Sequence, residues 1–378
     1  MTRNRTVMLA AGGTGGHLFP AFALAEELGR RGFTVDLMTD MRGDRYGTGF
    51  PARAVHQVPS ATLASKSPVA VARTGMTLAR GILAARKIMK EVKPAVVVGF
   101  GGYPSFPPLL AARHLAIPTM LHEQNAVLGR ANKMLARRVD AIATSFETTK
   151  FLDGPLLAKS RFTGNPVRGI VVQAASAPYP LLAPDGPFNL LVFGGSQGAR
   201  YFSDAIPPAL SLLPASLKAR LTVVQQAREE DVIRVREAYA ASGISAEIAT
   251  FFKDLPARMA ASHLVIGRAG ASSVAELTVI GRPSILVPLP HSLDNDQLQN
   301  ATRLAESGGG WCIEQRTLSP ERLSAEIARL MEGGAELREA ADCAKKLGRP
   351  DAVARLATLV EELAGPAKND MAAPSRVS

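Results

Sequence analysis

The chain has 378 residues, 47% of them hydrophobic, which is enough for two buried cores, and we find neither an apolar run long enough to span a bilayer nor a signal-peptide pattern. The net charge of +11 falls entirely in the first part, because residues 1–160 hold 21 Lys and Arg against 10 Asp and Glu, whereas residues 161–378 hold 23 of each. This asymmetry predicts an anionic partner, which could be a nucleic acid or an anionic membrane surface. Aromatic residues make up only 5% and do not interleave with the basic ones, which disfavours stacking on single-stranded nucleic acid.

The first predicted element is a buried strand at residues 7–11, which ends in the glycine-rich stretch AGGTGGH. A helix with apolar spacing is predicted over residues 20–31, so strand, glycine turn and helix make the first unit of a doubly wound α/β sheet. Glycines let backbone N–H groups approach a ligand, and the turn therefore predicts a sugar-phosphate cradle. The dinucleotide fingerprint fails at Leu18, although Asp40, near the end of the next strand, keeps a nicotinamide enzyme as a minor alternative.

A basic helix is predicted from about residue 69 within the segment 65–93. At 100° per residue its cations fall in one stripe with apolar side chains beside it, while Leu78, Ile82 and Met89 fall on the opposite side, which we expect to face the core. Cations interleaved with apolar side chains suit an anionic bilayer surface. The predicted membrane patch consists of Arg73, Met76, Arg80, Leu83 and Lys87.

Two further strands of the first half, at residues 95–100 and 119–123, are each followed by a motif. The first motif is the glycine loop GFGGYPSFP, which should open on the same crevice as the first glycine turn, because the carboxyl ends of parallel strands share one edge of a sheet. The second is the run His122-Glu123-Gln124-Asn125, whose side chains are costly to bury and suit the recognition of hydroxyl groups.

The second half repeats the pattern of strand, glycine turn and helix at FNLLVFGGSQGAR, residues 188–200. Strands predicted at residues 221–226, 263–268 and 284–289 alternate with helices, which indicates a second doubly wound domain. We place the boundary near residues 161–168, with an N-terminal domain at 1–163, a C-terminal domain at 164–349, a last helix at 350–364 and a disordered tail at 365–378.

Two motifs of the second half carry chemistry. In GRAGASSVAEL, Glu276 can accept both hydroxyls of a ribose or form a capping box with Ser273. In PHSLDNDQLQNA, Asp294 and Asp296 have the D-x-D spacing of a magnesium–diphosphate site, but Asp is also favoured at the helix start predicted there.

Seven motifs in this order, GGTGGH, GFGGYPS, HEQNAVLGRANK, TGNPVR, GGSQGAR, GASSVAE and D-x-Q-x-x-NA, resemble the MurG family of N-acetylglucosaminyltransferases over residues 5–364. The resemblance implies an α/β fold of GT-B type, with two Rossmann-like doubly wound domains facing across a cleft. The N-terminal domain would hold the lipid-linked acceptor, the C-terminal domain would hold UDP-GlcNAc, and the last helix would return to the first domain.

The implied reaction is the inverting transfer of GlcNAc from UDP-GlcNAc to the C4 hydroxyl of lipid I, which gives lipid II and UDP in peptidoglycan synthesis. UDP-GlcNAc is then a substrate, and neither a cofactor nor a tightly bound metal is expected. The resemblance also implies a peripheral protein on the cytoplasmic face of the inner membrane, so the expected anionic partner is a membrane surface and no nucleic acid.

The implied reaction needs a general base, and the resemblance, carried over position by position, implies an acceptor loop and a donor site. His17 is the predicted base, because a helix N-terminus should keep its ring neutral, and Glu123 is the alternative. Asp296 stands where the family pattern has a glutamine. The acceptor loop consists of Gly101, Gly102 and Tyr103. The donor site consists of Thr14, Gly15, Gly16, Asn125, Arg168, Ser196, Phe252, Ala271, Ser272, Ser273, Val274, Ala275, Glu276 and Gln297.

Two other functions stay open at this point. One is a related GT-B glycolipid synthase with a different acceptor, which the HEQNAVLG and GFGGYPS segments disfavour. The other is a regulatory protein that binds a nucleotide sugar without turnover. Product formation on a lipid I analogue distinguishes these functions, whereas binding of UDP-GlcNAc does not.

Overall fold

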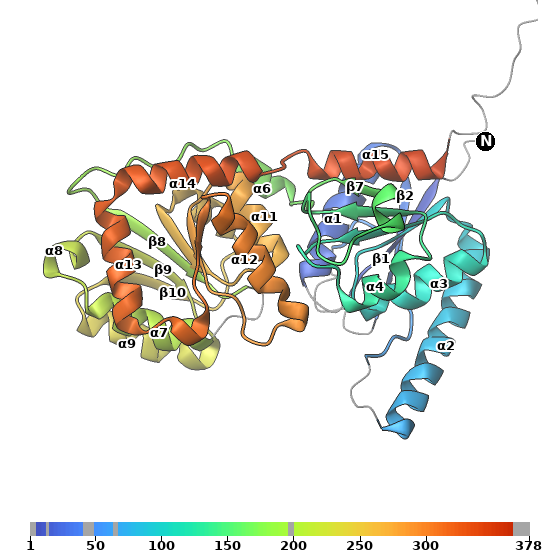
Figure 1. The fold of residues 1–378 in the computed structure, drawn as a ribbon, viewed down its shortest axis with the longest axis horizontal. Coiled ribbons are helices and arrows are strands. Elements are labelled where there is room, and N and C mark those ends of the chain that lie inside the picture. Colours follow the sequence, from blue (N-terminus) through green and yellow to red (C-terminus); the bar gives the residue numbers. More distant parts are fainter. Residues whose placement is uncertain (1–4, 13–14, 41–48, 63–66, 196–199, 366–378) are drawn as a thin grey trace, which may run out of the picture. The chain divides into compact units, whose positions relative to one another are not determined.

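The computed structural model describes residues 5–12, 15–40, 49–62, 67–195 and 200–365 (Figure 1). The chain divides into two compact units, one formed by Met1–Pro166 with Asp351–Ser378 and the other by Val167–Pro350. Each unit contains one sheet whose strands all pair in parallel, with seven strands in unit 1 and six in unit 2. Two doubly wound α/β domains are therefore confirmed.

Unit 1 has the strand order β3-β2-β1-β4-β5-β6-β7. Its strands are β1 (Thr6–Ala10), β2 (Thr34–Thr39), β3 (Ala54–Gln57), β4 (Val96–Gly99), β5 (Thr119–Glu123), β6 (Ala141–Thr144) and β7 (Ser160–Phe162). Its helices are α1 (Gly15–Arg30), α2 (Pro68–Val92), α3 (Phe106–His114), α4 (Arg130–Ala136), α5 (Pro155–Ala158) and α15 (Ala352–Ala364), with a short 3-10 turn, η2 (Tyr103–Ser105).

The central strands of unit 1 are buried on both faces, which is why β1 and β4 are nearly continuous apolar runs in the sequence, while β5 ends in the buried polar residues His122 and Glu123. On one face, Val7 and Leu9 of β1 pack with side chains of α1 and α15. On the other face, Met8 packs with side chains of α2, α3 and α4. Helices thus cover both faces of the sheet, and the loops at the carboxyl ends of the strands are left to form a site.

Helix α1 begins earlier than the sequence predicts. Its first residue is Gly15, five residues before Pro20, which lies inside the helix. Proline is common at the first position of a helix, and this preference led to the prediction that the helix starts at Pro20. Because the helix includes His17, the ring lies in the first turn rather than in the loop before it.

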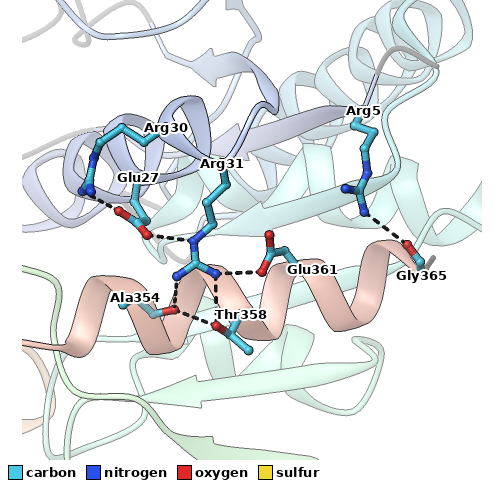
Figure 2. Close-up of polar contacts among 8 residues, drawn as sticks. All are labelled: Arg5, Glu27, Arg30, Arg31, Ala354, Thr358, Glu361 and Gly365. Carbon is cyan, nitrogen blue, oxygen red and sulfur yellow. Dashed lines mark hydrogen bonds and ion pairs between the residues drawn. The ribbon is translucent and has the colours of Figure 1, made fainter. Parts of the chain in front are cut away.

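Helix α15 comes from the far end of the chain and packs on α1 in unit 1 (Figures 1 and 2). The guanidinium of Arg31 joins the two helices: Nε donates to Glu27 at 2.7 Å, and Nη1 donates to Glu361 at 2.7 Å. Nη2 of Arg31 also donates to the carbonyl of Ala354 at 3.0 Å (Figure 2). Leu356 and Val360 of α15 also pack in the hydrophobic core of unit 1. The last helix is therefore part of the first unit.

Helix α2 is long and only partly covered. Ser67 caps it by accepting a hydrogen bond from the N–H of Ala70, and its N-terminal half extends beyond the rest of unit 1 (Figure 1). Met89 is buried, and the carbonyl oxygen of Pro59 lies 2.1 Å from the point where a Cβ on Gly81 would stand, so only glycine permits this approach. Among the helices that the structure describes, none is both long and apolar enough to cross a membrane.

Unit 2 has the strand order β10-β9-β8-β11-β12-β13, and side chains of α7, α9 and α13 pack on one face of this sheet. Its strands are β8 (Phe188–Phe193), β9 (Leu221–Gln226), β10 (Ser245–Ala249), β11 (Leu264–Gly267), β12 (Ser284–Leu286) and β13 (Gly310–Cys312). Its helices are α6 (Gly169–Ala174), α7 (Arg200–Ser211), α8 (Ala215–Lys218), α9 (Val232–Ala241), α10 (Leu255–Ala261), α11 (Ala271–Ile280), α12 (Asp296–Glu306), α13 (Pro320–Glu332) and α14 (Gly334–Leu347). Its 3-10 turns are η3 (Glu229–Asp231), η4 (Leu293–Asn295) and η5 (Gln315–Thr317).

Candidate active site

The polar site of unit 1 forms where the adjacent strands β1, β4 and β5 end. The turn after β1 leads to His17, the loop after β4 contains Gly101 and Gly102, and Gln124 directly follows β5. Both glycines have positive φ angles, of 84° and 68°, which a side chain would strain. A Cβ on Gly102 would lie 3.3 Å from the His17 ring, so the glycine loop lies against the imidazole. The structure thus brings together the three segments that the sequence placed at one sheet edge.

A chain of hydrogen bonds runs inward from His17. Its Nδ1 lies 3.2 Å from Oε1 of Gln124, and Nε2 of Gln124 lies 2.9 Å from Nδ1 of His122. Nε2 of His122 in turn lies 3.2 Å from the carbonyl oxygen of Gly164. His122 and Gln124 are buried, whereas His17 is partly exposed, so the chain links a ring that a substrate can reach to the interior of unit 1.

Burial lowers the pKa of His122 from its usual 6.5 to about 4, because the charged ring loses its hydration. The stability that the neutral ring contributes is present above pH 6.5 and is lost as the pH falls toward 4, where the folded protein also takes up the proton. We expect this group to contribute about 3 kcal/mol to the fall in the free energy of unfolding over that range.

His122→Gln is the matched variant, since an amide can still donate to Gly164 and accept from Gln124 without titrating there. Urea unfolding curves of both proteins between pH 7 and 4, followed by circular dichroism, measure the difference. The stability gap between wild type and variant should narrow as the pH falls. Parallel pH curves would show that His122 does not titrate as described.

Glu123 is buried and anchors the loop after β5. Its side chain is 1% exposed, and Oε1 accepts from the backbone N–H of Asn125 at 3.0 Å and from Nδ2 of the same residue at 3.3 Å. Oε2 accepts from the N–H of Gly129 and from Nδ2 of Asn132, both at 2.8 Å. Burial raises the pKa of the carboxyl, although the four donors oppose the shift. A raised pKa suits a base, but both oxygens are already engaged, so the geometry argues against Glu123 as the alternative base.

The other predicted residues of unit 1 lie at the start of α1, after β4 and after β5. Gly15 is buried against the ring of Phe19, Gly16 is exposed, and Asn125 is partly exposed. Tyr103 is partly exposed in η2, which is fixed to β1 because the Ser105 hydroxyl lies 2.9 Å from the carbonyl oxygen of Ala10. Thr14 lies outside the described residues, as does Ser196 of unit 2.

The predicted donor residues of unit 2 follow the carboxyl ends of β10, β11 and β12, except Arg168, which is the N-cap of α6. Arg168 precedes α6 and donates from Nη2 to Oε1 of Glu276 at 3.2 Å. Burial raises the pKa of the Glu276 carboxyl, and Arg168 opposes that shift. Glu276 is the sixth residue of α11, whose N-cap is Gly270, so the alternative capping box with Ser273 does not form. The pairing of Arg168 with Glu276 takes its place.

The N-terminus of α11 is open to a ligand. Gly270 caps it without a side-chain hydrogen bond, and Ala271, Ser272, Ser273 and Ala275 are partly exposed, whereas Val274 is buried. Backbone N–H groups and the helix dipole favour an anion at this end. The residues predicted to hold phosphates therefore lie at a suitable helix end.

Gln297 and Phe252 have protein partners of their own. Oε1 of Gln297, in the first turn of α12, accepts from the N–H of Leu289 at 3.0 Å. The ring of Phe252 is buried, and the guanidinium of Arg258 lies over it at 4.4 Å. Asp296 is the first residue of α12, as predicted for a helix start. Within the described ranges no three His, Cys, Asp or Glu side chains gather as a metal site requires.

Sequence analysis missed the residues that tie these loops together. Gln226 at the end of β9 accepts from the N–H of Gly194 at 3.1 Å and donates to the carbonyl of Thr250 at 3.1 Å. Asn300 is buried and donates to the carbonyl of Ala269 at 3.0 Å. For Gln226 the available signal is a polar side chain at the end of a strand. In unit 1 the same signal marks Gln124, which the sequence placed in a polar run suited to the recognition of hydroxyl groups.

Comparison with known proteins covers both units. Residues 7–144 match the glycosyltransferase family 28 N-terminal domain, and residues 189–356 match the glycosyltransferase family 28 C-terminal domain. The UDP-N-acetylglucosamine–N-acetylmuramyl-(pentapeptide) pyrophosphoryl-undecaprenol N-acetylglucosamine transferase of Methylobacterium sp. (strain 4-46) is 55% identical over 359 residues, covering 95% of this chain and 96% of the relative. The transferase of the same name from Mesorhizobium japonicum is 54% identical over 361 residues, covering 95% of each chain.

Solved structures show the same fold. The crystal structure of Acinetobacter baumannii MurG is similar with a TM-score of 0.78 at 29% identity, covering 95% of this chain and 99% of that one. The calicheamicin glycosyltransferase has a TM-score of 0.65 at 16% identity and covers 98% of this chain and all of its own. The second likeness, at this low identity, concerns the fold alone.

Proposed function

This chain belongs to glycosyltransferase family 28, and we propose that it transfers GlcNAc from UDP-GlcNAc to N-acetylmuramyl-(pentapeptide) pyrophosphoryl-undecaprenol, that is, lipid I, to give lipid II in peptidoglycan synthesis. Its two parallel sheets and its glycosyltransferase neighbours confirm the predicted GT-B fold class. The observation that carries the proposal is the 55% identity to a transferase of that name over 95% of the chain.

The proposed reaction is a single displacement. The C4 hydroxyl of the acceptor sugar attacks C1 of the α-linked GlcNAc, its proton passes to His17, and the C1–phosphate bond breaks with its electron pair leaving on UDP. Because the hydroxyl attacks C1 from the side opposite to the leaving phosphate, the new linkage is β. A positioned general base contributes about 10²–10⁴-fold to the rate.

Unit 2 would stabilise the leaving group. The diphosphate gains negative charge as the bond breaks, and the open N-terminus of α11 presents backbone N–H groups where that charge would develop. Arg168 supplies a cation beside it, and each well-oriented donor is worth about 3 kcal/mol in such sites. Glu276 would accept the ribose hydroxyls of the donor, with Arg168 holding its carboxylate in place.

The direct test is turnover on a lipid I analogue with UDP-GlcNAc, followed as release of UDP and formation of the disaccharide product. A regulatory protein would bind UDP-GlcNAc and give no product. A glycolipid synthase would give product only with a different acceptor. Either result would overturn the proposed function.

Glu276→Ala is expected to weaken UDP-GlcNAc binding by about 1–3 kcal/mol, because the buried ribose diol loses its acceptor. Calorimetric titration with UDP-GlcNAc and the donor KM measure the loss. Glu306→Ala, which removes an exposed carboxylate at the end of α12, is the matched control and should leave both unchanged. An unchanged donor KM in a folded Glu276→Ala protein would contradict the ribose role.

We also propose that α2 docks unit 1 on the anionic cytoplasmic leaflet as a peripheral contact. Arg73, Arg80 and Lys87 are exposed along α2. Met76 and Leu83, next to them, are 57% and 65% exposed. On a helix face in contact only with water, polar side chains would be expected at these positions. Cations with apolar neighbours suit a lipid surface.

Reversal of Arg73, Arg80 and Lys87 to Glu is expected to abolish co-sedimentation with anionic liposomes, because each cation contributes about 1 kcal/mol near such a surface. UDP-GlcNAc affinity should not change. The matched control reverses Arg236, Arg316 and Arg322, three exposed residues of unit 2, and alters net charge equally. The docking surface would be rejected if the control lost co-sedimentation with liposomes to the same extent. It would also be rejected if the α2 variant co-sedimented like the wild-type protein.

A further inference from the structure

The orientation of the Gln124 amide is fixed by its partners. Its Nε2 lies 3.1 Å from the carbonyl oxygen of His122, which can only accept a hydrogen bond. The same Nε2 lies 2.9 Å from Nδ1 of His122. Two acceptors on one side require the NH₂ group there, so Oε1 of Gln124 is the atom that faces Nδ1 of His17.

The tautomer of His122 agrees with this orientation. Its Nε2 faces the carbonyl oxygen of Gly164 at 3.2 Å and must therefore carry a proton. Burial keeps the ring neutral at physiological pH, so Nδ1 carries the lone pair that accepts from Gln124. Each bond in the chain thus has one defined direction, from His17 to Gln124, from Gln124 to His122 and from His122 to Gly164.

The same logic decides the proton on His17. An amide oxygen can only accept, so Nδ1 of His17 donates to it, and in the neutral ring the lone pair then lies on Nε2. The glycine loop lies against this side of the ring, where a Cβ on Gly102 would stand 3.3 Å from Nε2. The missing side chain leaves room beside the nitrogen that carries the lone pair.

We propose that Gln124 is a positioning residue that holds His17 as the Nδ1–H tautomer and so makes Nε2 its basic atom. The catalytic part of this inference rests on the proposed function, in which His17 accepts the proton of the acceptor hydroxyl. In that step the O–H bond breaks, an Nε2–H bond forms, and the hydroxyl oxygen bonds to C1 while UDP leaves. The imidazolium then carries both protons, and Gln124 continues to accept from Nδ1 without reorienting.

The spectroscopic test needs no activity. In ¹⁵N-histidine-labelled protein at about pH 8, where an unperturbed imidazole is neutral, long-range nitrogen–proton correlations report the tautomer of each ring. The chain has six histidines, and the signal that disappears in His17→Gln identifies His17. We expect the Nδ1–H tautomer in the wild-type protein. An Nε2–H tautomer in the wild type would overturn the proposal, whether or not any Gln124 variant folds.

The second arm removes the acceptor. Gln124→Met keeps the length of the side chain and should abolish the preference for the Nδ1–H tautomer, with kcat falling about tenfold and the KM for UDP-GlcNAc staying within twofold. A changed tautomer with wild-type kcat would overturn the positioning role.

The two proposals fail differently. If His17→Gln keeps wild-type turnover while His17 is the Nδ1–H tautomer in the wild type, the base role is wrong and the tautomer assignment stands. If His17→Gln is inactive and the wild-type ring is the Nε2–H tautomer, the base role stands and Gln124 does not set it.

Discussion

His17→Ala is expected to lower kcat by at least about 10²-fold, and by up to about 10⁴-fold, because the acceptor hydroxyl would lose its general base. The His17 ring lies in the first turn of α1 beside the glycine loop, and its Nδ1 contacts Gln124. Among the described histidines of unit 1, none other lies against this loop in a way that could replace it. UDP-GlcNAc binding should stay near wild type, since the proposed role of the ring is proton transfer from the acceptor. Single-turnover rates and calorimetric titration with the donor measure the two quantities separately.

His114→Ala is the matched control, because His114 is an exposed histidine at the end of α3. It should leave both kcat and donor affinity unchanged. Wild-type turnover by a folded His17→Ala protein would rule out the base role, whereas a large rise in donor KM with unchanged kcat would assign His17 to binding instead.

Glu123→Ala is expected to destabilise unit 1 by at least about 3 kcal/mol. The carboxylate accepts four hydrogen bonds at the end of β5, and each buried donor left without an acceptor costs about 1–3 kcal/mol. The lost contacts hold the segment from Asn125 to Asn132, so the loop after β5 should open first. Hydrogen exchange of the β5 amides at about pH 7 measures the loss in the unit concerned.

Glu123→Gln distinguishes a role of Glu123 as a structural anchor from a role as the general base. The amide has nearly the same shape and keeps one accepting oxygen, so its stability should fall between those of wild type and Glu123→Ala. An anchor predicts that kcat per folded molecule stays within a few-fold of wild type. A loss of about 10²-fold or more in a fully folded Glu123→Gln protein would restore Glu123 as the base.

The strands could be predicted from the sequence, because a strand buried on both faces is a continuous apolar run. The predicted strands 119–123 and 221–226 are β5 and β9 with the predicted bounds, and β8 is the apolar start of the predicted strand–turn–helix pattern 188–200. The apolar stripe of α2 likewise predicted that Met89 would be buried. Local composition is sufficient to predict these elements, because apolar residues become buried whichever helices or strands cover them.

The sequence also placed the site residues at the ends of the right strands, and it named His17 and Glu276. Glycine turns, a polar run and a helix N-terminus are local signals of that place. Their functional roles remain predictions, but the loops after β1, β4 and β5 do meet, because these strands are neighbours in the sheet.

Only the tertiary structure decided which polar atoms are paired. Gln124 lies 107 positions from His17, and Arg168 lies 108 positions from Glu276, so no local spacing links either pair. By sequence Glu123 is the alternative base, whereas the structure shows that its carboxylate accepts from four donors in the loop after β5 and in α4. The physical reason is that strand order determines which chain segments meet, and a buried polar atom must find its partner among them.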